Sequence, residues 1–146
     1  MYTFFKRSLP EPNLVLFDCP DASGAAPQRA ASNTPLQALA TLNDPQFVEA
    51  ARALAESAMQ DTTAFDARLD YISTRVLARR LAANERLIAR KAYTDFERYY
   101  GTHPEDARLF LDDGERKPDP SLARSEHAAL TMLASQLLNL DEVLNK

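Results

Sequence analysis

Turn-forming residues, cysteine and tryptophan are scarce in this sequence. Its 146 residues include three glycines, one cysteine and no tryptophan. Because an all-β fold needs many tight turns, the low glycine content argues against that fold class. The single cysteine, Cys19, excludes an intrachain disulfide, and the absence of a Cys-x-x-Cys-His motif excludes covalent attachment of a c-type haem. We therefore expect no cofactor in this chain.

The sequence also lacks an excess of basic residues and a long apolar run. The formal net charge of -4 argues against a nucleic-acid-binding protein, because phosphate neutralisation needs a basic surface. No apolar run is long enough to cross a bilayer, so we expect no membrane insertion. A signal peptide has a basic region followed by an apolar core, and the N-terminal residues do not show this pattern.

Apolar residues recur at the three- and four-residue spacing of helices in several stretches. The clearest stripes are Phe47, Val48, Ala51, Leu54, Ala55, Ala58 and Met59, then Phe65, Leu69, Ile72, Val76 and Leu77, and finally Leu130, Leu133, Leu137, Leu140 and Leu144. The spacing predicts an all-α fold, an irregular or orthogonal bundle of about five to six helices with an extended N-terminal arm. We expect residues 1–146 to form a single helical domain, with the arm and a loop over 1–31 and the helical core over 32–146.

Several local features of this fold can be predicted. Leu14–Phe17 is expected to lie as an extended apolar clamp on the helices, because no second strand is available to pair with it. Residues 82–85 are expected to break a helix, with Asn84 as the cap of the next one, although a single long kinked helix is the alternative. Gly101 is well placed to end that helix in a left-handed conformation. The last helix is expected to run from about Leu122 along the leucine seam to the C-terminus.

Two helix starts stand close together in the sequence. Proline suits the first position of a helix, so Pro35 and Pro45 are each expected to open one, after a polar cap. Two interpretations of the polar residues here remain open: free N–H groups at two helix N-termini could hold an anion, or the side chains are caps that fix the angle between the helices. Capping accounts for all but Gln37 in the set Asn33, Thr34, Gln37, Asn43 and Asp44.

Two other groups of polar residues are candidates for contacts. The long loop that follows Phe17 carries Asp18, Asp21 and Arg29. The tail carries Asn139, Asp141 and Glu142, for which we favour a structural role, since neighbouring residues on a helix do not face each other as paired carboxylates or metal ligands would. His103 and His127 each lack a second ligand at metal-binding spacing, so no metal site and no catalytic residue is predicted.

The segments NTPLQAL at 33–39 and LNDPQFV at 42–48 resemble the signature of a planctomycete-type domain of unknown function. Collinear similarities lie at YTF with Lys6-Arg7, FDCPD at 17–21, HPED at 103–106, and LTMLA and LLNLDEVLNK in the tail. The stretch before Asn33 usually carries more arginine in that family than Arg29 alone, which weakens an anion-binding role for the loop. The break at 81–85 usually contains Pro-Thr, which is absent here.

This resemblance implies a helical C-terminal module of large exported proteins, which often also carry a planctomycete cytochrome c-like domain. The resemblance implies a periplasmic or extracellular location. The residues of the chain do not themselves indicate a cellular location. We expect a non-catalytic helical module, a fragment that packs on other domains of the parent protein or self-associates through an apolar patch near Met1–Phe17. One alternative is an enzyme or redox-linked fragment whose site is shared with missing domains. The other is a partner-binding adaptor that uses the leucine seam.

Overall fold

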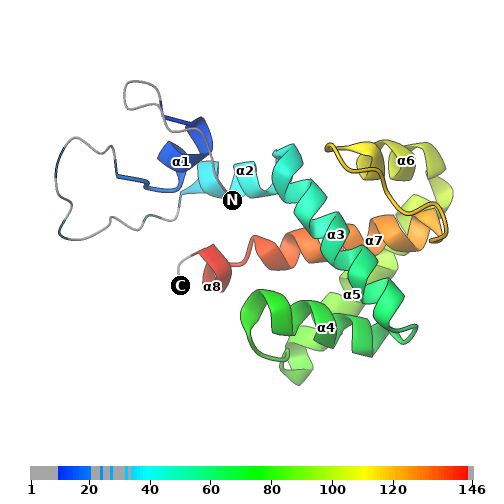
Figure 1. The fold of residues 1–146 in the computed structure, drawn as a ribbon. Helices are drawn as coiled ribbons and strands as arrows, with labels where there is room; N and C mark the ends of the chain where they lie inside the picture. Colours follow the sequence, from blue (N-terminus) through cyan, green and yellow to red (C-terminus); the bar gives the residue numbers. More distant parts are fainter. Residues whose placement is uncertain (1–9, 21–23, 25–26, 28–31, 33, 145–146) are drawn as a thin grey trace.

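The computed structural model describes residues 10–20, 24, 27, 32 and 34–144. These residues form eight helices and no strand, which confirms the all-α prediction. Six of the helices have nine residues or more, and two short ones lie near the ends of the chain (Figure 1). The helices are α1 (Pro12–Leu16), α2 (Pro35–Asn43), α3 (Pro45–Asp61), α4 (Phe65–Leu77), α5 (Ala83–Thr102), α6 (Pro104–Asp112), α7 (Arg124–Leu138) and α8 (Asp141–Leu144).

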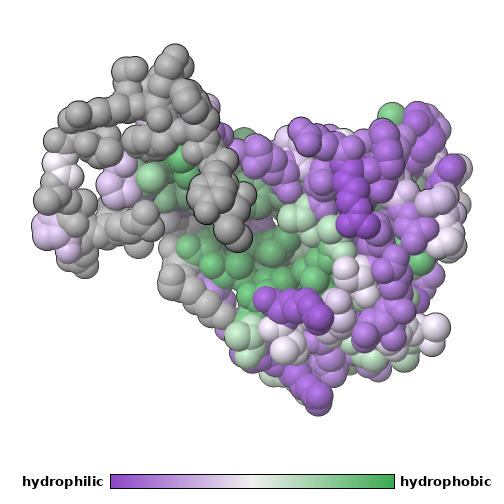
Figure 2. All heavy atoms as spheres, in the orientation of Figure 1, coloured by the Kyte–Doolittle hydropathy of each residue, from purple (hydrophilic) through white to green (hydrophobic). Residues whose placement is uncertain are grey.

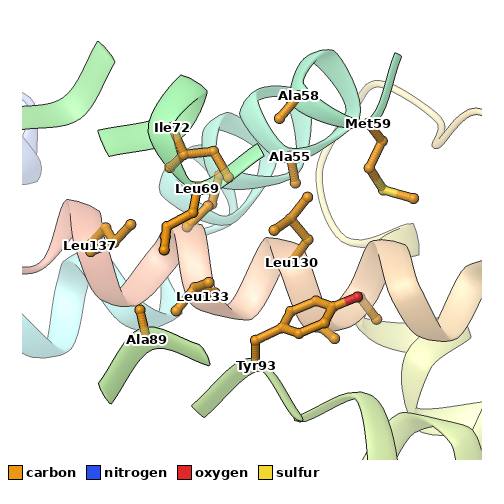
Figure 3. Packing of buried hydrophobic residues seen from close by; sticks show 14 of the residues in the cluster. Ala55, Ala58, Met59, Leu69, Ile72, Ala89, Tyr93, Leu130, Leu133 and Leu137 are labelled. Carbon is orange, nitrogen blue, oxygen red and sulfur yellow. The ribbon is translucent and has the colours of Figure 1, made fainter. Parts of the chain in front are cut away.

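Helix α7 is the central element of the bundle. It contacts α2, α3, α4, α5, α6 and α8, and most extensively α3 and α5, between which it runs. Nine of its fifteen residues are buried, because helices cover it on several sides. The predicted seam packs as expected over Leu130, Leu133 and Leu137, all buried in the core (Figure 3).

Small side chains bring α3 close to α7. Ala51, Ala55 and Ala58 lie on one face of α3 and have no exposed surface. Without long side chains between them, the two helices can approach closely, and Leu130 of α7 lies beside Ala55 in the core (Figure 3). Leu69 and Ile72 of α4 and Tyr93 of α5 complete the core around α7.

The two predicted proline starts are confirmed. Helix α2 begins at Pro35 after Thr34, and α3 begins at Pro45 after Asp44, whose carboxylate accepts the Gln46 N–H. Asn33, the other candidate cap for α2, lies outside the described residues. None of the helices that the described residues form is long and apolar enough to cross a membrane.

The N-terminal arm differs from its prediction. The Leu14–Phe17 stretch is not extended, because most of it belongs to the short helix α1. Glu11 caps this helix by accepting the Leu14 N–H, and Pro12 occupies its first position. The chain leaves α1 through Asp18, which has a positive φ of 57°. The same cap-and-proline device that starts α2 and α3 therefore also starts α1.

Three predicted helix boundaries were wrong. The break near residues 82–85 is real, but Ala82 rather than Asn84 is the cap residue of α5, and Glu85 accepts the Ala82 N–H. Gly101 lies inside α5, which runs on to Thr102 because Pro104 opens the next helix. The tail is not one helix: α7 ends at Leu138, and α8 starts after a turn.

Candidate functional site

Gln37 joins three parts of the polar junction. Its side-chain oxygen accepts the Thr34 N–H at 2.9 Å while the Thr34 hydroxyl accepts the Gln37 N–H at 3.3 Å, which forms a capping box at the start of α2. Its amide nitrogen donates to the carbonyl oxygen of Leu16 at 2.8 Å and to the hydroxyl of Ser32 at 3.0 Å. Gln37 is only 2% exposed, whereas Thr34, Leu16 and Ser32 are partly exposed, so these bonds are partly shielded from solvent.

Asp18 and Ser32 bring the two ends of the long loop together. The backbone N–H and the hydroxyl of Ser32 donate to the same oxygen of Asp18, at 2.8 and 2.7 Å. The hydrogen bond from the Ser32 hydroxyl, followed by the one from its backbone, lowers the pKa of Asp18. The structure thus brings Asp18 close to Gln37, at 3.5 Å from its amide nitrogen. Asp21 and Arg29, the other two loop candidates, lie outside the described residues.

Asp44 connects the start of α3 to α1, whereas Asn43 makes no connection of this kind. One oxygen of Asp44 caps α3, and the other accepts from the side-chain amide of Asn13 at 2.9 Å. Asn43 is exposed and donates to the carbonyl oxygen of Leu39 in its own helix. Asp44 and Gln37 therefore anchor α1 at two separate points.

The tail residues divide between two contacts. The Thr41 hydroxyl of α2 donates to the side-chain oxygen of Asn139 at 2.7 Å, which joins α2 to the end of α7. Glu142 in α8 pairs with Arg79, which also pairs with Glu85, and each of these contacts measures 2.8 Å. Asp141 opens α8 and is exposed. The three tail candidates do not form one site.

Helix α2 is turned with its polar side inward. Gln37 and Thr41, one helical turn apart, are both buried, while Leu36 is 60%, Leu39 56% and Leu42 39% exposed. Amphipathic helices of globular proteins normally bury the apolar stripe instead. Figure 2 shows hydrophobic residues over α1 and in the hollow beneath α2. The exposed leucines of α2 and Val15 of α1, which is 57% exposed, are named here the α2 apolar face.

A shallow groove runs between α1 and α2 along this face. Its lining combines apolar residues with the polar residues Asn13, Asn43 and Asp44. The lining residues are Pro12, Asn13, Leu16, Leu36, Leu39, Ala40, Asn43 and Asp44. Asn13, Leu16 and Asp44 take part both in this lining and in the hydrogen bonds of the polar junction, so the junction fixes the two helices between which the groove lies.

Arg52 is the main buried polar residue that the sequence interpretation missed. It is 1% exposed, and its guanidinium donates to the carbonyl oxygens of Leu111, Asp113 and Arg116. Glu49, one turn earlier on α3, accepts the backbone N–H groups of Arg116 and Glu115, and these bonds lower its pKa. Both side chains hold the segment that follows α6. The signal available in the sequence was an arginine within the apolar stripe of α3.

The histidines and the cysteine lie apart from one another. His127 is buried in α7, His103 is exposed at the start of α6, and Cys19 is partly buried after α1. Burial lowers the pKa of His127. Among the residues that the structure describes, no three His, Cys, Asp or Glu side chains form a group that could hold a metal ion.

Comparison with known proteins agrees with the resemblance noted in the sequence. A family model described as a protein of unknown function (DUF1553) matches residues 1–93. The matched range includes the polar junction, the α2 apolar face and the helices from α1 to α4. No curated protein and no solved structure matches the chain. The chain therefore belongs to the DUF1553 family of proteins of unknown function.

Proposed function

We propose that the chain is a non-catalytic helical module that packs on other domains of a large exported protein through the α2 apolar face. The observation that carries this proposal is the orientation of α2, which buries Gln37 and Thr41 and exposes three leucines. An amphipathic helix gains stability by removing its apolar stripe from water. Since this chain does not bury that stripe, a neighbouring domain is the natural cover for it.

The energy available from covering this face is sufficient for docking. Complete burial of one valine or leucine side chain contributes about 1.5–3 kcal/mol. Scaled by the exposed fractions of Val15, Leu36, Leu39 and Leu42, the face would contribute roughly 3–6 kcal/mol. Two domains of the same polypeptide need less than two separate proteins, because the linker keeps them at a high effective concentration.

Two observations favour this proposal over the alternatives. The polar groups of Gln37 and Asp18 are hydrogen-bonded within the chain, which supports a structural role for the junction rather than a site for substrate. The leucine seam of α7 is buried as far as Leu137, so a partner that binds this seam would have to displace the core. The α2 apolar face needs no such displacement.

The test uses the segments encoded on either side of this chain in its reading frame, produced as separate polypeptides. Isothermal titration calorimetry should show that one of them binds the chain. The double variant Leu36→Gln/Leu39→Gln should lose this binding at least tenfold, because it removes apolar side chains and retains helix propensity. The matched control is Leu87→Gln/Ile88→Gln, which changes two residues of α5 that are somewhat more exposed than Leu36 and Leu39, and this variant should bind as the wild type does.

Three results would overturn the proposal. The first is a reading frame that encodes no further segment. The second is a neighbouring segment that neither binds as a separate polypeptide nor protects α2 from hydrogen exchange when it is joined to the chain. The third is undiminished binding by the Leu36→Gln/Leu39→Gln variant. Thermal unfolding of both double variants should stay close to the wild type, since all four side chains are mainly exposed.

A further inference from the structure

A hollow at the N-terminal end of α7 combines a buried histidine with cationic side chains. Its volume is about 230 Å³, and its lining comes from the start of α7, the end of α6 and the segment that links these helices. In Figure 1, α6 and that segment lie beside the N-terminal part of α7. We infer that the hollow binds a small hydroxycarboxylate, an anion whose carboxylate stands next to a hydroxyl group.

One ring nitrogen of His127 has a partner within the chain. The residue is 1% exposed, and its Nε2 lies 3.5 Å from the carbonyl oxygen of Arg52. A carbonyl oxygen can only accept a hydrogen bond, so Nε2 carries the proton of the neutral ring and Nδ1 is left as an acceptor. Burial favours this neutral ring, because it lowers the pKa of His127.

The other ring nitrogen, Nδ1, opens into the hollow. None of the residues that the structure describes forms a hydrogen bond with it. Every fully buried side-chain nitrogen or oxygen in that part of the chain does have a partner. Nδ1 is therefore not fully buried, and the small exposed part of His127 faces the hollow that this residue lines. A ligand hydroxyl placed there would donate a hydrogen bond to Nδ1.

The lining of the hollow carries more positive than negative charge. Arg108, Lys117 and Arg124 contribute three cations, and Asp112 and Asp119 contribute two carboxylates. Asp112 is paired with Arg108 at 2.9 Å and lies 4.0 Å from Lys117. Arg124 forms no ion pair with any residue in the described part of the chain, so it is the lining cation that remains for a ligand.

Asp119 does not occupy Arg124 either. One of its oxygens accepts from the backbone N–H and the hydroxyl of Ser121, at 2.9 and 2.7 Å, and the other accepts from the side-chain amide of Gln60 at 3.1 Å. The guanidinium of Arg124 has the planar, two-donor geometry that suits a carboxylate. Arg124 is also the first residue of α7, and a helix N-terminus favours negative charge. A carboxylate at Arg124 with its hydroxyl toward His127 satisfies both groups.

The test follows the imidazole nitrogens by NMR while sodium glycolate or sodium acetate is added to the whole chain at constant ionic strength. Both anions carry a carboxylate, and only glycolate has a hydroxyl. Glycolate should shift the Nδ1 signal of His127 with a Kd of about 1–10 mM, since so small a ligand makes few contacts. Acetate should bind about fivefold more weakly, because it leaves Nδ1 without a donor. His103, exposed at the other end of α6, is the internal reference and should not shift.

Variants locate the binding. Arg124→Gln removes the unpaired cation and should weaken glycolate binding at least about threefold. The matched control is Arg75→Gln, which changes an exposed arginine of α4 outside this lining and should bind as the wild type does. His127→Gln keeps an amide donor for the Arg52 carbonyl and removes Nδ1, so it should bind glycolate and acetate equally. Circular dichroism checks its fold, and the wild type and Arg124→Gln test the inference without it.

Five results would overturn the inference. Three concern the wild type: His127 signals that do not shift at about 100 mM glycolate, equal affinity for glycolate and acetate, and tighter binding of inorganic phosphate than of glycolate. The fourth is undiminished glycolate binding by Arg124→Gln. The fifth is a folded His127→Gln variant that still prefers glycolate to acetate.

Discussion

Replacement of Gln37 by alanine should destabilise the chain by about 1–3 kcal/mol. The change removes three side-chain hydrogen bonds, to the Thr34 N–H, the Leu16 carbonyl and the Ser32 hydroxyl. Each such bond contributes about 0.5–1.5 kcal/mol net, and alanine returns a few tenths through its helix propensity. The loss should be large for a single polar side chain, because its bonds join α1 to the segment that leads into α2.

Urea unfolding followed by circular dichroism measures this change as a lower midpoint at an unchanged m-value. Gln136→Ala on the exposed side of α7 is the matched control and should stay within about 0.5 kcal/mol of the wild type. Gln37→Glu should be at least as harmful at pH 7, because it places a carboxylate against the Leu16 carbonyl and beside Asp18. A Gln37→Ala variant as stable as the control would refute the structural interpretation of the junction.

Other perturbations test the loop after α6 and the surface charges. Arg52→Met should cost about 3–5 kcal/mol in urea unfolding, because three carbonyl groups lose a buried charged donor, and a loss below about 1 kcal/mol would contradict this role. Gly114→Ala should destabilise by about 1–3 kcal/mol, since φ is +94° and the added Cβ would meet the Glu49 carboxylate; an unchanged melting temperature would argue against it. The Arg79 guanidinium lowers the pKa of Glu85 from 4.5 to about 2. Because the folded pKa is depressed, this contribution is complete above about pH 4.5 and is lost as the pH falls toward 2. When the pH falls below about 4.5, the melting temperature of Glu85→Gln should therefore decrease less than that of the wild type. An equal decrease in the two proteins would disprove the coupling.

The parts of the fold that depend on local chemistry were predictable. Prolines after polar caps placed the starts of α2 and α3, and the leucine spacing of the tail placed the buried face of α7. Boundaries without such signals were missed. Ala78 ends α4 in a left-handed conformation at a φ of 58°, and an alanine gives no sequence signal for that conformation. Gly101 lies within α5, because Pro104, rather than the glycine, determines where that helix ends.

The candidate site was predictable only as a set of caps. Sequence periodicity shows which residues of α2 share a face, but not which face turns inward, since that depends on contacts from distant segments such as Asn139. Arg52 could not be matched to partners, because it binds backbone carbonyls 59 to 64 positions away and a carbonyl group has no sequence signature. Gln37 was noticed as unexplained, and its bonds to Leu16 and Ser32 supply the reason for its burial.

Hydrogen exchange of the chain with and without its neighbouring encoded segment tests the central claim most directly. If the α2 apolar face is a docking surface, amides of α1 and α2 should exchange more slowly when the neighbouring segment is bound, because local opening would then require undocking. Amides around Leu87 and Ile88 on α5 should be unaffected. Unchanged exchange in α2, or new protection confined to α5 and α6, would contradict the account.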